Sequence, residues 1–194
     1  MRLETWAEHT ICPDLIEKGG WVLDAGSLRH DFQNEAIKHE LCVAAIDPNP
    51  SPLSWCYALV GKNNPKLFWH PEHDAAASYV NKVDSPTATT IASITIQKVM
   101  DIIGINKFEI VKLDIEGCEL DVLQNWPGLV SKQISIEFHA HNWHGEGNYS
   151  QLETEAIKYI SQWYTPVQHE KSCRHCLSIP NYWDSLFIQK DLVI

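Results

Sequence analysis

Acidic side chains stand where three apolar runs of the sequence end. Asp24 follows "WVL", Asp47 follows "CVAAI" and Asp114 follows "EIVKL". Ligands of open α/β sheets bind beyond the carboxyl ends of the strands, so these positions would border a ligand crevice. Carboxylates there can accept hydrogen bonds from hydroxyl groups or act as general bases.

The first two acids have the surroundings of a ribose-binding pair. Gly26 and Ser27 follow Asp24, and a glycine lets the backbone turn tightly and approach a ligand closely. Pro48 keeps Asp47 out of helical geometry. An acid at the end of the second strand can accept hydrogen bonds from both ribose hydroxyls. We favour this interpretation over an N-cap and a turn aspartate.

A second acidic group is expected around Asp114. Glu116 follows it in the turn to the next helix, and alternation along "ISIEFH" puts Glu137 and His139 on one face of another strand. If that strand neighbours the Asp114 strand, Asp114, Glu137 and His139 converge. Such groups could bind a divalent metal or act as general bases, and the spacing does not choose between the two.

These residues must be positioned by an α/β fold. Apolar runs alternate with helix-like segments, which indicates a Rossmann-like domain: about seven strands, mostly parallel, flanked by helices. We expect one domain over 1–194, with a helical extension over 1–20 and an irregular excursion over 62–90. Helices are predicted within 3–18, 31–40, 93–104, 118–128 and 150–164. The last strands, within 165–171 and 184–190, are expected to form an antiparallel hairpin.

The composition limits the classes of partner and the cellular location that we expect for this chain. The net charge of −10 argues against a nucleic-acid partner, which would favour a basic face. Charged residues interrupt every apolar run, and the N-terminus lacks an apolar signal core, so we expect no membrane association and no export. Six cysteines without a complete metal-finger spacing indicate a reducing, cytoplasmic location. The oligomeric state does not follow from the sequence.

Five segments in order carry a family resemblance: "VLDAGSLRHDFQNEAI", "AAIDPNP", "FEIVKLDIEGCELDVLQ", "ISIEFH" and "WDSLFIQ". The chain resembles the FkbM-type methyltransferases, which are class I S-adenosylmethionine-dependent enzymes, over most of residues 21–190. The segment "KLDIEGCE" is the most specific match. The resemblance implies methylation of a hydroxyl on a small molecule such as a sugar or a natural product.

The resemblance also implies roles for individual residues. Asp47 would hold the cofactor's ribose hydroxyls. The residues that would border its methionine part are Asp24, Gly26 and Ser27, and those beside the transferred methyl group and the acceptor are Asp114 and Glu116. For the base we consider His139 or Glu137, with Asp114 positioning the substrate or a metal. A requirement for a divalent metal is the less favoured alternative.

One position departs from the family pattern. The second glycine of the first loop is replaced by His30, beside Arg29. An imidazole there could obstruct the cofactor, whereas Arg29 could pair with its carboxylate. This departure motivates a second hypothesis, a catalytically degenerate methyltransferase fold that only binds a ligand. A nicotinamide-dependent oxidoreductase and a metal-dependent hydrolase are less favoured.

Overall fold

A seven-stranded sheet forms the centre of the computed structural model, which describes residues 1–49, 51–62, 67–69, 78–80, 89–115, 118–139, 149–170 and 182–193. Its strands, in spatial order, are β13 (Tyr164–Glu170), β14 (Tyr182–Gln189), β12 (Ser131–His139), β11 (Phe108–Leu113), β3 (Trp21–Ala25), β4 (Cys42–Asp47) and β5 (Trp55–Cys56). Strand β14 runs antiparallel to both of its neighbours, β12 and β13, and the other neighbouring pairs of the sheet are parallel. The mostly parallel sheet and the terminal hairpin of β13 and β14 are therefore confirmed.

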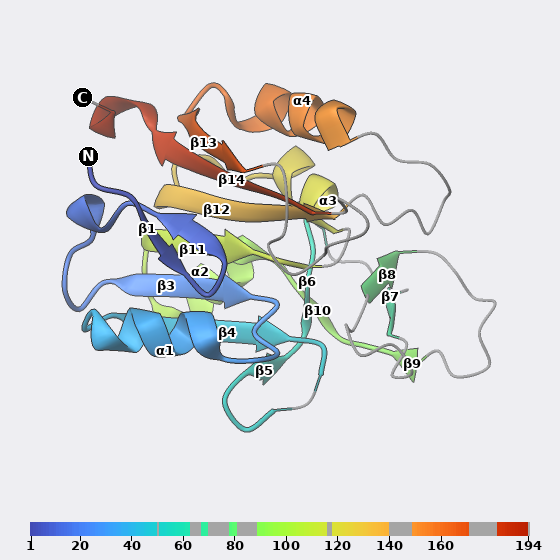
Figure 1. The fold of residues 1–194 in the computed structure, drawn as a ribbon. Helices are drawn as coiled ribbons and strands as arrows, with labels where there is room; N and C mark the ends of the chain where they lie inside the picture. Colours follow the sequence, from blue (N-terminus) through green and yellow to red (C-terminus); the bar gives the residue numbers. More distant parts are fainter. Residues whose placement is uncertain are drawn as a thin grey trace.

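Helices cover both faces of the sheet, which explains why its inner strands are apolar on both sides. On one face α1 (Asp31–Lys38) packs Phe32 and Ala36 onto Val22 and Ile110. The opposite face carries α2 (Ile96–Ile103), α3 (Glu119–Gln124) and α4 (Tyr149–Ile160). Figure 1 shows α1 in front of the sheet and α2 behind it.

Local signals explain where α2 begins and ends. Thr95 caps its start by accepting a hydrogen bond from the Lys98 backbone N–H, at 3.3 Å. Gly104 ends it in the left-handed conformation, at φ 75°.

The N-terminal segment is a hairpin, and the helical extension expected over residues 1–20 is wrong. Strands β1 (Glu4–Trp6) and β2 (His9–Ile11) pair antiparallel, and a 3₁₀ turn follows at Pro13–Leu15. The apolar side chain of Trp6, which suited a helix face equally well, packs against Phe32 of α1 at a ring distance of 5.9 Å. The hairpin thus covers the same sheet face as α1.

Two smaller sheets complete the described residues. Strand β6 (Ala58–Leu59) pairs with β10 (Ser93–Ile94). Within the segment expected to be irregular, β7 (Leu67–Trp69) pairs with β8 (Ser78–Val80) and β9 (Thr89–Thr90), so that expectation needs correction at these strands. The last described element is a 3₁₀ turn at Lys190–Leu192.

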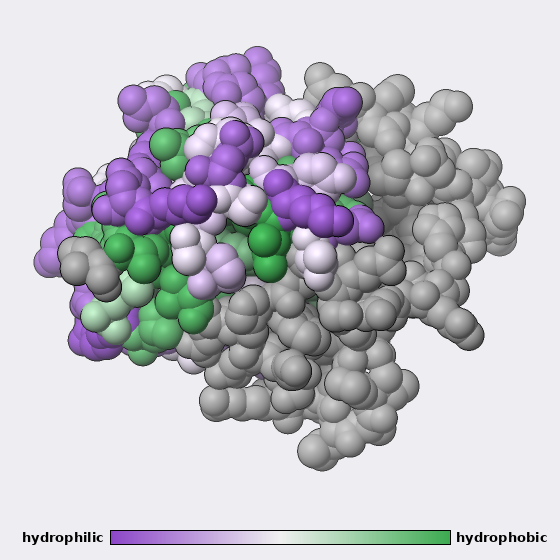
Figure 2. Space-filling view, turned by 90° about the horizontal axis from the view of Figure 1, so that it is seen from above, coloured by the Kyte–Doolittle hydropathy of each residue, from purple (hydrophilic) through white to green (hydrophobic). Residues whose placement is uncertain are grey.

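The described surface on the side of α4 carries hydrophilic residues interspersed with hydrophobic patches (Figure 2). Helix α4 turns Ala156 and Ile160 into the core and leaves Tyr159 37% exposed. Among the described helices, none combines the length and the apolar character needed to cross a bilayer.

Candidate functional site

The strand order of the sheet reverses between β3 and β11, and this switch point organises the site. From β3 the chain continues outward to β4, whereas from β11 it continues to β12 on the other side. Ligands of such sheets bind beyond the carboxyl ends of the strands at this point. Asp24, Asp47 and Asp114 all lie at this edge, as the sequence predicts.

Gly26 forms the turn at the end of β3, in close contact with the neighbouring strand ends. Its N–H donates to the Ile46 carbonyl at 2.9 Å, and the Asp114 N–H donates to the Ala25 carbonyl at 3.1 Å. The Gly26 φ is +82°, and a Cβ at this position would collide with the backbone oxygen of Asp114. Both the conformation and the space therefore require glycine.

We expect Gly26→Ala to destabilise the fold more than Gly19→Ala does. Both glycines have a positive φ, which costs an L-residue about 1–2 kcal/mol. A Cβ at Gly19 meets nothing within 4 Å, whereas at Gly26 the collision adds about 1–3 kcal/mol. Urea unfolding of the two variants would measure the difference, and equal losses would contradict the close packing described here.

A buried ion-pair network lies directly beneath the turn. Lys112 of β11 is opposite Asp24 of β3 in the parallel register, and its Nζ lies 3.2 Å from Asp24 Oδ1 and 3.2 Å from Asp114 Oδ2. The same Nζ donates to the Gly26 carbonyl at 2.6 Å. Lys112 thus connects the cofactor turn predicted from sequence to the acid at the end of β11.

The charges of this network depend on one another. Burial by itself lowers the pKa of Lys112, but attraction to Asp114 and Asp24 outweighs burial and holds the pKa above its ordinary value. Asp24 is completely buried, and the Lys112 ammonium lies 3.2 Å from its Oδ1. Its charge is therefore compensated mainly by the Lys112 ammonium.

Asp47 ends β4 as a buried carboxylate. Burial raises the pKa of Asp47, although the Asn49 N–H, which donates to Oδ1 at 2.7 Å, opposes the shift. A buried carboxylate with one backbone donor has lone pairs to offer to further donors. This is the chemistry that a ribose diol requires.

The turn after Gly26 adds two polar side chains. Ser27 is buried, and its Oγ has no hydrogen-bond partner among the described residues. His30 adopts φ 56°, the left-handed conformation that a glycine would favour, and its Nε2 lies 3.0 Å from Ser51 Oγ. His30 therefore keeps the backbone path of the loop glycine, while Arg29 is exposed.

On the other side of the switch point, Asp114 and Glu137 come together. Strands β11 and β12 are neighbours, so the predicted convergence of these two acids is confirmed. His139 ends β12, but its side chain lies outside the described residues, as does Glu116 entirely. The structure also brings His9 of β2 to these two acids, with its Nε2 3.9 Å from Asp114 Oδ2.

Sequence reasoning missed Lys112 and His9 for different reasons. A charged residue inside the apolar strand "FEIVKL" must be paired when buried, so Lys112 carried a usable signal. His9 carried no such signal, because its place depends on a hairpin docking onto β12, far along the chain. The polar face of β12, by contrast, correctly indicated that Glu137 needs partners.

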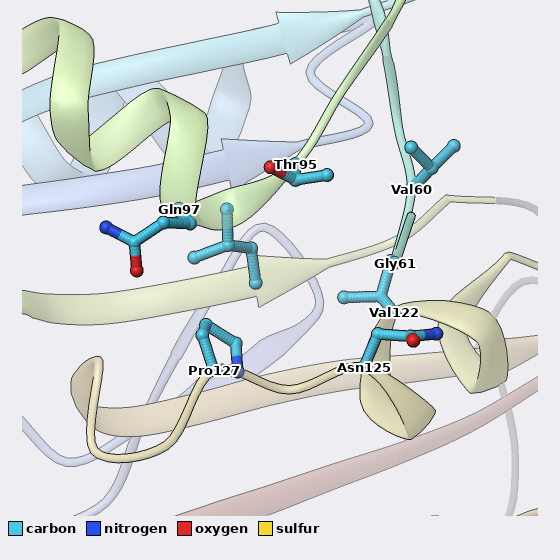
Figure 3. A pocket seen from close by; sticks show the side chains of 8 residues that line it. Val60, Gly61, Thr95, Gln97, Val122, Asn125 and Pro127 are labelled. Carbon is cyan, nitrogen blue, oxygen red and sulfur yellow. The ribbon is translucent and has the colours of Figure 1, made fainter. Parts of the chain in front are cut away.

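A separate small pocket lies on the opposite side of the sheet. It is lined by the residues after β6, the start of α2, and α3 with the segment after it, including Val60, Thr95, Gln97 and Asn125 (Figure 3). Its volume is about 100 Å³ and no titratable side chain lines it. Pockets for cofactor-sized ligands are about 300–1,000 Å³, so this cavity is too small for one.

The family model described as methyltransferase FkbM domain matches residues 36–169. No curated protein gives a significant match. The matched segment covers β4, β11 and β12, whereas the turn at Gly26 precedes it.

Three solved structures are similar in fold. The fibrillarin pre-rRNA processing protein of Methanococcus jannaschii is 13% identical with a TM-score of 0.52, covering 93% of this chain and 70% of that one. A TehB-like SAM-dependent methyltransferase of Corynebacterium glutamicum is 13% identical with a TM-score of 0.46, covering 91% and 84%. The 1,6-didemethyltoxoflavin-N1-methyltransferase of Burkholderia thailandensis, solved with S-adenosylhomocysteine, is 18% identical with a TM-score of 0.47, covering 89% and 72%.

Proposed function

Because the chain belongs to the FkbM methyltransferase domain family, and is thus an S-adenosylmethionine-dependent methyltransferase, we propose that it methylates a hydroxyl group of a small molecule such as a sugar or a natural product. The observation that carries this proposal is the meeting of two acidic groups at one switch point. Asp24 and Asp47 lie on one side of it, and Asp114 and Glu137 on the other.

The first acidic group fits the cofactor. S-adenosylmethionine supplies an electrophilic methyl group on a sulfonium cation that leaves as a neutral thioether. Asp47 would accept hydrogen bonds from the ribose hydroxyls, which a carboxylate with free lone pairs does well. The unpartnered Ser27 hydroxyl and the close backbone approach at Gly26 support a ligand lying along this turn, next to Asp24.

The second acidic group fits the acceptor. Asp114 remains 27% exposed at the crevice, so it can accept a hydrogen bond from an incoming hydroxyl and orient it. Among the residues that the structure describes, Glu137 is the candidate for the base that takes the hydroxyl's proton as the oxygen attacks.

The composition supports the same class of acceptor. The net charge of −10 supports a small-molecule acceptor rather than a nucleic acid. The free thiols of Cys42 and Cys56 are consistent with a reducing cytoplasm.

Asp47→Asn is the test of the cofactor site. Hydrogen bonds to a charged group contribute about 1.5–3 kcal/mol, so we expect the variant to bind S-adenosylmethionine about 10- to 100-fold more weakly. Isothermal titration calorimetry measures this. Asp31→Asn, at an exposed aspartate of α1, is the matched control and should bind like the wild type.

Asp47→Asn should weaken cofactor binding without lowering the stability of the unliganded protein. A raised pKa means that ionising Asp47 costs more free energy in the folded chain than in the unfolded chain. Above that pKa the ionised carboxylate therefore opposes folding, and at pH 7 the unliganded Asp47→Asn protein should be at least as stable as the wild type. Unchanged cofactor affinity, or no affinity in the wild type, would contradict the assignment.

A further inference from the structure

Three possible metal ligands from separate segments converge on the sheet face that the hairpin covers. His9 comes from β2, Asp114 follows β11, and Glu137 lies in β12; one ligand atom of each lies within 4.8 Å of the others. We propose that these three side chains bind one divalent cation. One imidazole nitrogen and two carboxylate oxygens form a set that suits Mn²⁺ and related first-row ions.

The surroundings of His9 hold its ring in place for this role. The side chain is buried, and Nδ1 lies 3.2 Å from Ser135 Oγ. Metal-binding histidines usually donate the second ring N–H to an oxygen, which fixes the tautomer. With Nδ1–H donated to Ser135, the Nε2 lone pair is directed at Asp114, 3.9 Å away. In this tautomer the lone pair and the carboxylate face each other, and a divalent cation between them would be bound by both.

The charge of the cluster also favours a cation. Asp24, Asp114 and Glu137 are three formal carboxylates, and Lys112 is the ammonium that contacts two of them. A divalent ion beside Asp114 and Glu137 would be attracted by both carboxylates. The Lys112 ammonium shares Asp114 with this cluster and is also held by Asp24 and by the Gly26 carbonyl.

Three protein ligands leave coordination positions for an acceptor. Resting on the proposed function, this narrows the acceptor to molecules that offer two adjacent oxygens, such as a vicinal diol or a hydroxyl beside a carbonyl. Coordination lowers the pKa of a hydroxyl, which prepares it for methyl transfer at neutral pH. Asp114 and Glu137 would then act on the acceptor through the cation.

Binding of Mn²⁺ to the full chain tests the site directly. After dialysis against a chelator, electron paramagnetic resonance titration should show about one bound Mn²⁺ per chain. Ser135→Ala removes only the group that orients His9, so we expect it to weaken Mn²⁺ binding roughly 10- to 100-fold. His9→Gln keeps most of the side-chain volume but removes a ligand, so we expect a larger loss of Mn²⁺ affinity. His39→Ala, at a histidine stacked on Trp6, is the control and should keep the ion.

The outcomes separate the cation site from the proposed function. Circular dichroism first establishes that the variants are folded. Binding that is lost in His9→Gln and kept in His39→Ala supports the site, and no binding to the wild type, or equal binding in all variants, overturns it. Affinity for S-adenosylmethionine, measured without metal, reports on the cofactor turn alone. Methyl transfer that persists in the presence of chelator would overturn the role of the cation in acceptor binding while leaving the proposed function standing.

Discussion

Lys112→Met should lower the free energy of unfolding by about 3–5 kcal/mol, because removing one partner of a buried ion pair leaves the other charge uncompensated. In this chain two carboxylates lose their ammonium, and Asp24 is completely buried. For a domain of this size the loss corresponds to a fall in Tm of roughly 6–20 °C. Thermal unfolding followed by circular dichroism measures it.

Two further variants show whether the loss comes from the ion pair. Lys38→Met removes an exposed lysine paired with Glu35 on α1, and we expect a change within about 0.5 kcal/mol. Adding Asp24→Asn to Lys112→Met removes the buried charge that lost its partner, so the double variant should recover part of the stability. If the double variant is less stable by the sum of the two single losses, Asp24 and Lys112 are not coupled.

Asp114→Asn should lower kcat by about 10²–10⁴-fold while leaving cofactor affinity within about tenfold, since it removes a charge from the acceptor side of the crevice. The amide has the shape of the carboxylate, and Lys112 keeps Asp24 as a partner, so the fold should persist. Transfer of a labelled methyl group to the best acceptor from a panel of monosaccharides and hydroxylated natural products measures kcat.

Asp101→Asn provides the matched control, because Asp101 is an exposed aspartate on α2 that accepts a hydrogen bond from Gln97. Its kcat should equal that of the wild type. A wild-type kcat in Asp114→Asn would show that the Asp114 carboxylate has no role in the reaction. A wild-type protein that binds S-adenosylmethionine but methylates no acceptor would instead favour the degenerate, ligand-binding alternative raised by His30.

The parts of the fold that the sequence predicts are those with local signals. Strands β3, β4 and β11 are buried on both faces, so they appear as near-continuous apolar runs, and glycine or proline marks where β3 and β4 end. Since parallel strands share one carboxyl edge, Asp24, Asp47 and Asp114 could be placed at that edge without knowing the strand order. Their contacts required the register of β3 against β11.

The hairpin could not be predicted because its turn lacks the usual residues. Two-residue hairpin turns with a positive φ at both positions favour Asn-Gly or Asp-Gly, whereas here Ala7 and Glu8 adopt φ 45° and 73°. Tertiary contacts hold this unfavourable turn: Trp6 packs on Phe32, and the Cys12 N–H donates to the Gln133 side chain at 2.8 Å. With the turn unrecognised, His9 could not be placed near Asp114.

The docking of this hairpin has a consequence for the order in which the molecule folds. His9 meets Ser135 across 126 positions of the sequence, and Cys12 meets Gln133 across 121. Contacts over such separations form only when a long loop has closed, which costs entropy and slows folding. During synthesis the first strands emerge early, yet they have no surface to dock on until β12 has been made and paired. We therefore expect the proposed acceptor side of the crevice to be completed later in folding than the turn at Gly26, whose partners lie in β4 and at the end of β11.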